Sequence, residues 1–207
     1  MRRGDVGKVG RRWALVVTSI WMVARFLGGP AQAYEPDLEF RKGAIITPQI
    51  GGGVSNNVER DQQHARVSFV NSTVRFGAVP WDPVSEGFWR GALEAGLEPW
   101  VQVYVTPSAV SEGVKGVARY HFLRASPIFP YVELSAGVVA TSLNIREIRS
   151  DFAFVLEGGA GLGYFVREGI ALTAGYRFQH VSNGGIESPN RGFNSDTGVA
   201  GVSFFFH

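Results

Sequence analysis

Apolar and polar side chains alternate along much of this chain, and this two-residue period limits the possible folds more than any other feature. Successive side chains of a β-strand point to opposite faces, so the alternation predicts strands. Turn-forming stretches such as "WDPVSEG", "RASPIFP" and "REG" separate the alternating segments. The sequence therefore predicts an all-β protein with about eight strands. They are Gly43 to Ser55, Ala65 to Val79, Phe88 to Val105, Gly113 to Phe122, Pro130 to Ala140, Phe152 to Val166, Gly169 to Val181, and Thr197 to Phe206.

The two faces of these segments differ in chemistry. In the segment from Gly169 to Val181, Tyr176 and Phe178 share an apolar face, whereas Arg177 lies on the opposite one. A soluble barrel hides its apolar face and exposes the charged one, and a barrel in lipid does the reverse. The alternation alone does not separate these two cases. The rest of the sequence has to decide between them.

The N-terminal residues 1–33 have the features of a secretory signal peptide. A basic start is followed by the apolar stretch Trp13 to Ala24 and by the small-x-small site Ala31-Gln32-Ala33. The apolar stretch is shorter than the roughly twenty residues that a membrane-spanning helix needs. We therefore expect residues 1–33 to be cleaved and residues 34–207 to form one outer-membrane β-barrel domain.

Removing the signal reverses the charge balance of the chain. Residues 34–207 contain 14 basic and 17 acidic side chains, although the whole sequence has an isoelectric point near 9.1. The basic character thus belongs to the signal and gives no reason to expect a nucleic-acid partner. The chain has no cysteine, which excludes a disulfide-bonded scaffold.

Several features together favour a membrane barrel over a secreted lipocalin-like barrel, which is the alternative. They are the export signal, segments of ten or more residues, aromatic residues near strand ends, and a last segment "GVSFFFH". We expect an eight-stranded antiparallel transmembrane β-barrel of a Gram-negative outer membrane. At about eight strands the interior is filled by side chains. Candidates to pair there are Glu94, Glu133, Glu157, Arg119 and Arg177, with His121 packed beside Arg119.

The stretch "YRFQHVSNGGIESPN", which begins at Tyr176, contains the candidate catalytic residues. Both termini of such barrels usually lie in the periplasm, so the seventh segment ends at the cell surface. By parity, His180 and Ser182 face the lipid with Phe178, where polar groups are costly unless they serve each other or a substrate. Ser182 is the candidate nucleophile and His180 its general base.

Two further groups in this stretch suit an oxyanion site. The Asn183 side chain and the Gly185 N–H are candidates to hold the negative charge that develops on an ester oxygen. His64, His121 and His207 do not form a metal-ligand spacing with His180, so we expect neither a metal nor a cofactor.

The same residues resemble a known family, the outer-membrane lipid A 3-O-deacylases of the PagL type. The resemblance rests on a His-x-Ser-Asn pattern near the outer end of the penultimate strand, a following glycine, and a Pro-Asn-x-Gly loop. The matching residues are His180, Ser182, Asn183, Gly185, Pro189, Asn190 and Gly192. The resemblance implies a hydrolase that removes an ester-linked acyl chain from lipid A, with lipopolysaccharide in the outer leaflet as its partner and no cofactor.

One position departs from the family pattern. Where the family has a glutamate that orients the histidine, this chain has Asn194. An asparagine can orient a catalytic histidine through its amide oxygen, as in papain-like triads. Asn194 is therefore the expected third residue, with Glu187 as the alternative acid and Asp196 as a further source of a carboxylate.

Two other functions stay open at this stage. A small structural or adhesion barrel would carry the motif without catalysis, and an esterase of the same design would act on another acylated lipid. The sequence does not fix the oligomeric state, and a homodimer is one option. The residues alone do not choose between lipid A and other esters.

Overall fold

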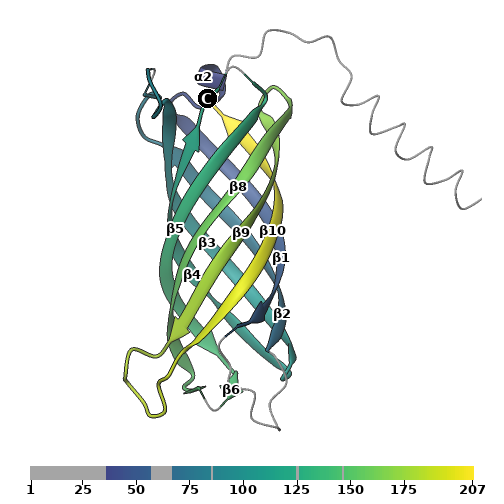
Figure 1. Ribbon diagram of the computed structural model, residues 1–207, viewed down its shortest axis with the longest axis vertical. Coiled ribbons are helices and arrows are strands. Elements are labelled where there is room, and N and C mark those ends of the chain that lie inside the picture. The colour runs from purple at the N-terminus through teal and green to yellow at the C-terminus, as the bar shows by residue number, and fades with distance from the viewer. Residues whose placement is uncertain (1–35, 57–66, 85, 125, 146) are drawn as a thin grey trace, which may run out of the picture. The chain divides into compact units, whose positions relative to one another are not determined.

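The predicted barrel is present in the computed structural model, which describes residues 36–56, 67–84, 86–124, 126–145 and 147–207. Eight long strands form one closed antiparallel sheet in the order β1-β10-β9-β8-β5-β4-β3-β2 (Figure 1). The eight-strand prediction is thus confirmed. The strands are β1 Gly43–Ser55, β2 Ser68–Val79, β3 Gly91–Thr106, β4 Ala109–Phe122, β5 Ile128–Thr141, β8 Phe152–Arg167, β9 Ile170–Ser182 and β10 Phe193–Phe206.

The structure differs from the sequence prediction mainly at the strand ends. The last strand begins at Phe193, four residues before the expected Thr197, because the fully buried Phe193 pairs with Val181 across the sheet. The fourth strand likewise begins at Ala109 rather than Gly113. Residues 1–33 and the start of the second predicted segment lie outside the described residues, so the signal peptide stays a prediction.

Three short elements were not predicted. The helix α2, Pro36–Glu39, precedes β1, and a hairpin of two short strands lies between β5 and β8. This hairpin pairs β6, Asn144–Ile145, with β7, Ile148–Arg149. No helix in the described ranges has the length and apolar character needed to cross a membrane.

The faces of the strands follow the predicted parity. On β9, Tyr176 and Phe178 point outward and are 49% and 39% exposed, whereas Arg177 points inward and is 3% exposed. Leucine, valine and phenylalanine side chains cover the outer wall on the other strands as well. A wall of this composition suits contact with hydrocarbon, and ring closure satisfies the backbone hydrogen bonds there.

The middle of the barrel is filled by a network of buried charges. Glu133 accepts hydrogen bonds from Arg75, Arg119 and Arg177, at distances between 2.7 and 3.0 Å. The predicted inward charges therefore do pair, and His121 bonds to Glu94 at 2.8 Å. Arg75, Glu98 and Lys115 also belong to the network, although the sequence interpretation did not single them out. Mutual pairing offsets the large cost of burying these ions.

Apolar layers close the interior on both sides of the charge network. At the end of the barrel where α2 lies, Phe40 is fully buried and packs against Phe129, Phe165 and Phe205 with ring centroids 5.1 to 5.8 Å apart. Glu39 links this apolar layer to the turn before β9, because its carboxylate accepts a hydrogen bond of 3.0 Å from the Gly169 N–H. Burial raises the pKa of the Glu39 carboxyl. The opposite end holds a cluster of buried residues that includes Phe69, Trp100, Tyr104, Ile148 and Phe193.

Candidate active site

His180 and Ser182 lie on the outer wall of the barrel, as parity predicts. Both are half-buried, and they alternate along the chain with the buried Val181 and Asn183. His180 pairs with Asn194 on β10 and with Leu156 on β8, so its neighbours on both sides are fixed by strand register. The site is therefore built on paired strands rather than on a mobile loop, which favours a defined side-chain geometry.

Asn194 holds the histidine ring. His180 Nδ1 lies 2.6 Å from Asn194 Oδ1, directly across the β9–β10 ladder. An amide oxygen only accepts hydrogen bonds, so Nδ1 carries the proton and donates it. This tautomer leaves Nε2 as the basic nitrogen of the ring. Asn194 is a residue of strand β10 in the structure.

Gly192 lies beside both the histidine and the serine. Its φ of +65° is a left-handed conformation that favours glycine. A Cβ placed on Gly192 would lie 2.9 Å from His180 Cε1 and 3.2 Å from Ser182 Cβ. Both catalytic candidates therefore pack against the same small surface, and only glycine leaves room for them. This steric requirement explains why the Pro-Asn-x-Gly motif has a glycine at position 192.

The loop after β9 is organised around Asn183, which is fully buried. Its Nδ2 donates to the Glu187 carbonyl at 2.8 Å, and its Oδ1 accepts from the Gly185 N–H at 3.0 Å. Its own N–H donates to Asn190 Oδ1 at 3.0 Å. Both predicted oxyanion donors thus make hydrogen bonds within the loop. Glu187, the alternative acid, contributes its backbone carbonyl oxygen to the loop and is exposed.

The unpredicted β6–β7 hairpin supports this loop. Asn190 forms a β-bridge with Ile148, which is fully buried, and the Arg191 N–H donates to the Glu147 carbonyl at 2.9 Å. The loop that carries the motif is therefore tied to a neighbouring connection of the barrel. Nothing in the sequence between residues 142 and 151 signals this role, because each of its strands has only two residues.

Asp196 lies beside the site but is otherwise engaged. It pairs with Phe178 in the strand register and so belongs to the outer face. Its Oδ1 accepts from the Tyr176 hydroxyl and its Oδ2 from Asn56 Nδ2, the latter at 2.9 Å. The carboxylate of Asp196 thus bonds to Tyr176 and Asn56, whereas Asn194 is the residue that bonds directly to His180.

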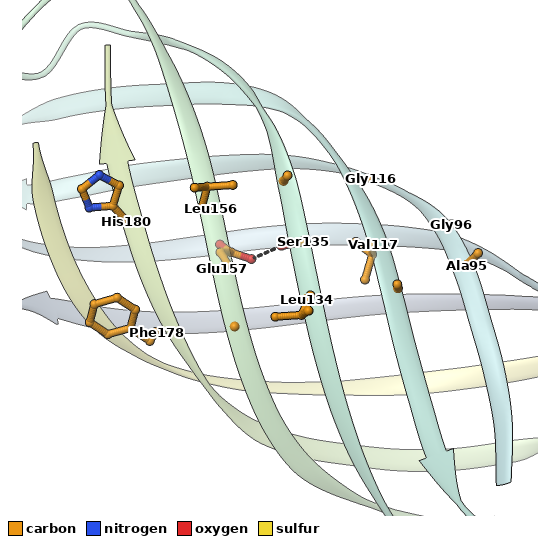
Figure 2. Close-up of a pocket in the computed structure, with 13 residues that line it drawn as sticks. Ala95, Gly96, Gly116, Val117, Leu134, Ser135, Leu156, Glu157, Phe178 and His180 are labelled. Carbon is orange, nitrogen blue, oxygen red and sulfur yellow. Dashed lines mark hydrogen bonds between the residues drawn. The ribbon is translucent and has the colours of Figure 1, made fainter. Parts of the chain in front are cut away.

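An apolar groove of about 860 Å³ begins at the histidine. It crosses the outer wall from His180 and Phe178 on β9 to Ala95 on β3 (Figure 2). Leu156 and Leu134 project along it, and the hydrogen bond of 2.9 Å between Ser135 and Glu157 lies in its floor. Glycine and alanine supply most of the remaining lining. The groove was not predicted, since it depends on the register of five strands.

Comparisons with known proteins agree with this geometry. Residues 69–203 match the model of the family described as lipid A 3-O-deacylase (PagL). The crystal structure of the outer membrane enzyme PagL superposes with a TM-score of 0.57 at 20% identity, covering 76% of this chain and 97% of that one. Neisserial surface protein A (NspA) gives 0.56 at 16% identity, with coverages of 79% and 97%. No curated protein sequence matches this chain.

The family match carries more weight than the two superpositions. At such low identity a structural likeness shows the fold alone, and the fold is shared with a surface protein as well as with an enzyme. The family match, in contrast, extends over well more than half of the chain and includes the whole of the candidate site. This chain therefore belongs to the PagL family of lipid A 3-O-deacylases and is a β-barrel of the bacterial outer membrane.

Proposed function

We propose that this protein is an outer-membrane esterase that removes one ester-linked acyl chain from lipid A, with Ser182 as nucleophile and His180 as general base. The observation that supports this most directly is the 2.6 Å bond between His180 Nδ1 and Asn194 Oδ1. It supports a fixed ring orientation and a defined tautomer for His180, which shares the outer face of β9 with Ser182. Desolvating these polar groups is costly, which a substrate ester offsets.

The chemistry follows the general scheme of acyl transfer. His180 Nε2 takes the hydroxyl proton as Ser182 Oγ attacks the ester carbonyl carbon. The tetrahedral intermediate collapses, the bond to the sugar oxygen breaks, and His180 returns the proton to that oxygen. Water then attacks the acyl-serine with the same histidine as base, which releases the fatty acid and restores the serine.

The loop after β9 would stabilise the negative charge that develops on the ester oxygen. Asn183 directly follows Ser182 in the chain and Gly185 lies three residues after it, and the Asn183 side-chain amide and the Gly185 N–H each bond to another loop atom. Their oxyanion role requires that these bonds are exchanged for bonds to the substrate oxygen. Gly184 and Gly185, with φ of +65° and +83°, give this part of the loop its left-handed backbone.

Asn194 is the proposed orienting residue in place of the family's glutamate. Its oxygen keeps the proton on Nδ1, which is the tautomer that catalysis needs. A neutral amide, however, stabilises the imidazolium less than a carboxylate does, because charged hydrogen bonds are about twice as strong. We therefore expect this enzyme to be active but slower than a variant with an acid at this position.

The test uses the full barrel refolded in detergent with lipopolysaccharide as substrate. Mass spectrometry should show the loss of one hydroxyacyl group with the natural sequence and no loss with Ser182→Ala or His180→Ala. Ser72→Ala is the matched control, since Ser72 is an exposed serine on β2, away from the site. Activity that survives in both site variants would overturn the assignment of the nucleophile and base.

The same assay decides between the alternatives left open by the sequence. Release of fatty acid from phospholipid, without release from lipopolysaccharide, would make the protein an esterase for another acylated lipid. No release from any acylated lipid would favour a structural or adhesion barrel. The homodimer and the cleavage after residue 33 stay predictions.

A further inference from the structure

The outer wall differs in polarity on the two sides of His180. The apolar groove lies on one side, over β8, β5, β4 and β3. On the other side, Asp196 on β10 is bonded to Tyr176 on β9 and to Asn56, the residue that follows β1. A substrate with an apolar and a polar part, whose ester lies at His180, therefore meets polar side chains on the β10 side.

Asp196 is an ionisable residue on the lipid-facing wall. It lies between the buried Ser195 and Thr197, so its side chain belongs to the outer face of β10. Its partners in the strand register are Phe178 on β9 and Val54 on β1, which are both exposed apolar residues. An ionisable group among lipid-facing apolar side chains is costly, and such groups are usually functional.

The hydrogen bonds of Asp196 leave part of its carboxylate available. The Tyr176 hydroxyl donates to Oδ1, and Asn56 Nδ2 donates to Oδ2 at 2.9 Å. A carboxylate has about four lone-pair sites, so each oxygen keeps one further acceptor site. Asp196 is only half-buried, and both of its partners are exposed. The two bonds therefore orient the carboxylate without closing it off from a ligand.

Asp196 lies one outward position away from the candidate catalytic residues. It is two residues after Asn194, which pairs directly with His180. Two residues of a strand span about 7 Å, and diagonal neighbours on adjacent strands lie about 7 to 8 Å apart. A sugar ring has similar dimensions. A polar substituent of the sugar that carries the ester can therefore reach Asp196 while the ester lies at His180.

The row of paired residues through Asp196 approaches the rim of the barrel. Phe178 lies four residues from the loop end of β9, Asp196 three residues from that end of β10, and Val54 one residue from that end of β1. The strands of such barrels are tilted, so a row that crosses them changes depth in the membrane. The β10 side thus faces the layer of lipid headgroups.

Resting on the proposed function, we propose that Asp196 determines specificity by accepting a hydrogen bond from a hydroxyl or amide N–H of the sugar that bears the ester. Tyr176 and Asn56 are positioning residues that hold the carboxylate. An ionised carboxylate only accepts hydrogen bonds and repels phosphate, so it selects the neutral, donor-bearing part of the sugar. The glycerol backbone of a diacyl phospholipid has no such donor beside its esters, so the contact favours acylated sugars.

The experiment compares two synthetic 3-O-acyl esters of N-acylated glucosamine, both without phosphate. The first ester has free hydroxyls and a free amide N–H, and the second carries a methyl group on each of them. Asp196→Ala should lower kcat/KM for the free ester by about tenfold or more, mainly through KM, and leave the methylated ester within about twofold. Esters methylated only on nitrogen or only on oxygen identify the donor. EDTA in the assay excludes a contact bridged by a divalent cation.

Glu112→Ala is the matched control. Glu112 is also a carboxylate on the outer wall, three residues after the first residue of β4, as Asp196 is three residues after the first residue of β10. Its replacement should leave both esters within about twofold of the natural sequence. Tyr176→Phe keeps Asp196 but removes one of its donors, so it should reduce the preference for the free ester by a smaller factor than Asp196→Ala.

The outcomes separate this inference from the proposed function. If the natural sequence releases no acid from these esters or from lipopolysaccharide, the proposed function fails and the sugar contact fails with it. If the natural sequence is active and Asp196→Ala changes both esters by the same factor, or changes neither, only the sugar contact is refuted. Release from lipopolysaccharide but not from the free ester would also refute it. Heat-modifiable migration in gel electrophoresis shows that each variant is folded before it is assayed.

Discussion

Replacing Asn194 with aspartate changes one property of the site while keeping its shape. The side chain has the same length, so Oδ1 stays near its 2.6 Å distance from His180 Nδ1 and gains a negative charge. A neutral hydrogen bond contributes about 1 kcal/mol net and one to a charged group about 1.5 to 3 kcal/mol. In the proposed mechanism, the difference favours the imidazolium that forms when Ser182 attacks.

A gain of about 1.4 kcal/mol in the transition state corresponds to about a tenfold increase in kcat/KM. The assay is release of hydroxyacyl groups from lipopolysaccharide under conditions in which the natural sequence turns over. Asn194→Glu, which restores the family's residue, should also be faster, and Asn194→Ala should be slower than both because it leaves the ring unheld. If both acidic variants fold and are no faster than the natural sequence, Asn194 does not orient a catalytic base.

Three further changes test other parts of the structure. Gly192→Ala should lower kcat at least tenfold, because a Cβ at 2.9 Å from His180 Cε1 must displace the ring. Phe40→Ala should destabilise the barrel by about 3 to 5 kcal/mol in urea-unfolding titrations, as expected for a fully buried aromatic, without changing kcat/KM. Glu133→Gln should cost about 3 to 5 kcal/mol in the same titration, since three arginines would lose a buried charged partner. A stability change below about 1 kcal/mol in either titration would contradict the packing described.

Features that depend on local backbone geometry could be predicted from the sequence. The inward position of Arg177 and Glu133 and the outward position of His180 and Ser182 follow from the two-residue period of a strand, which needs no knowledge of its neighbours. The start of β10 was predicted too late in the sequence, because Phe193 and Asn194 directly follow a loop that is rich in turn-forming residues. Their strand conformation comes from pairing with His180 and Val181, which is a long-range contact.

Features that depend on register between strands could not be predicted. Gly116 and His180 are far apart in the sequence, and only the pairing of β9 with β8, β5 and β4 brings them to one groove. The contact of Asn190 with Ile148 has the same origin. The resemblance to the deacylase family predicted the candidate site residues, but the steric reason for Gly192 depends on its neighbours in space.

The position of His180 and Ser182 on the outside of the wall has a consequence for how substrate arrives. The buried ion pairs of Glu133 fill the interior, so a lipid substrate of the proposed site would reach it from the side, through the plane of the bilayer. For the proposed function we therefore expect two-dimensional encounters and a turnover that follows the mole fraction of acylated lipid around the barrel rather than its amount in the suspension. Diluting the substrate with inert amphiphile should slow the reaction even when the total quantity of substrate is held constant.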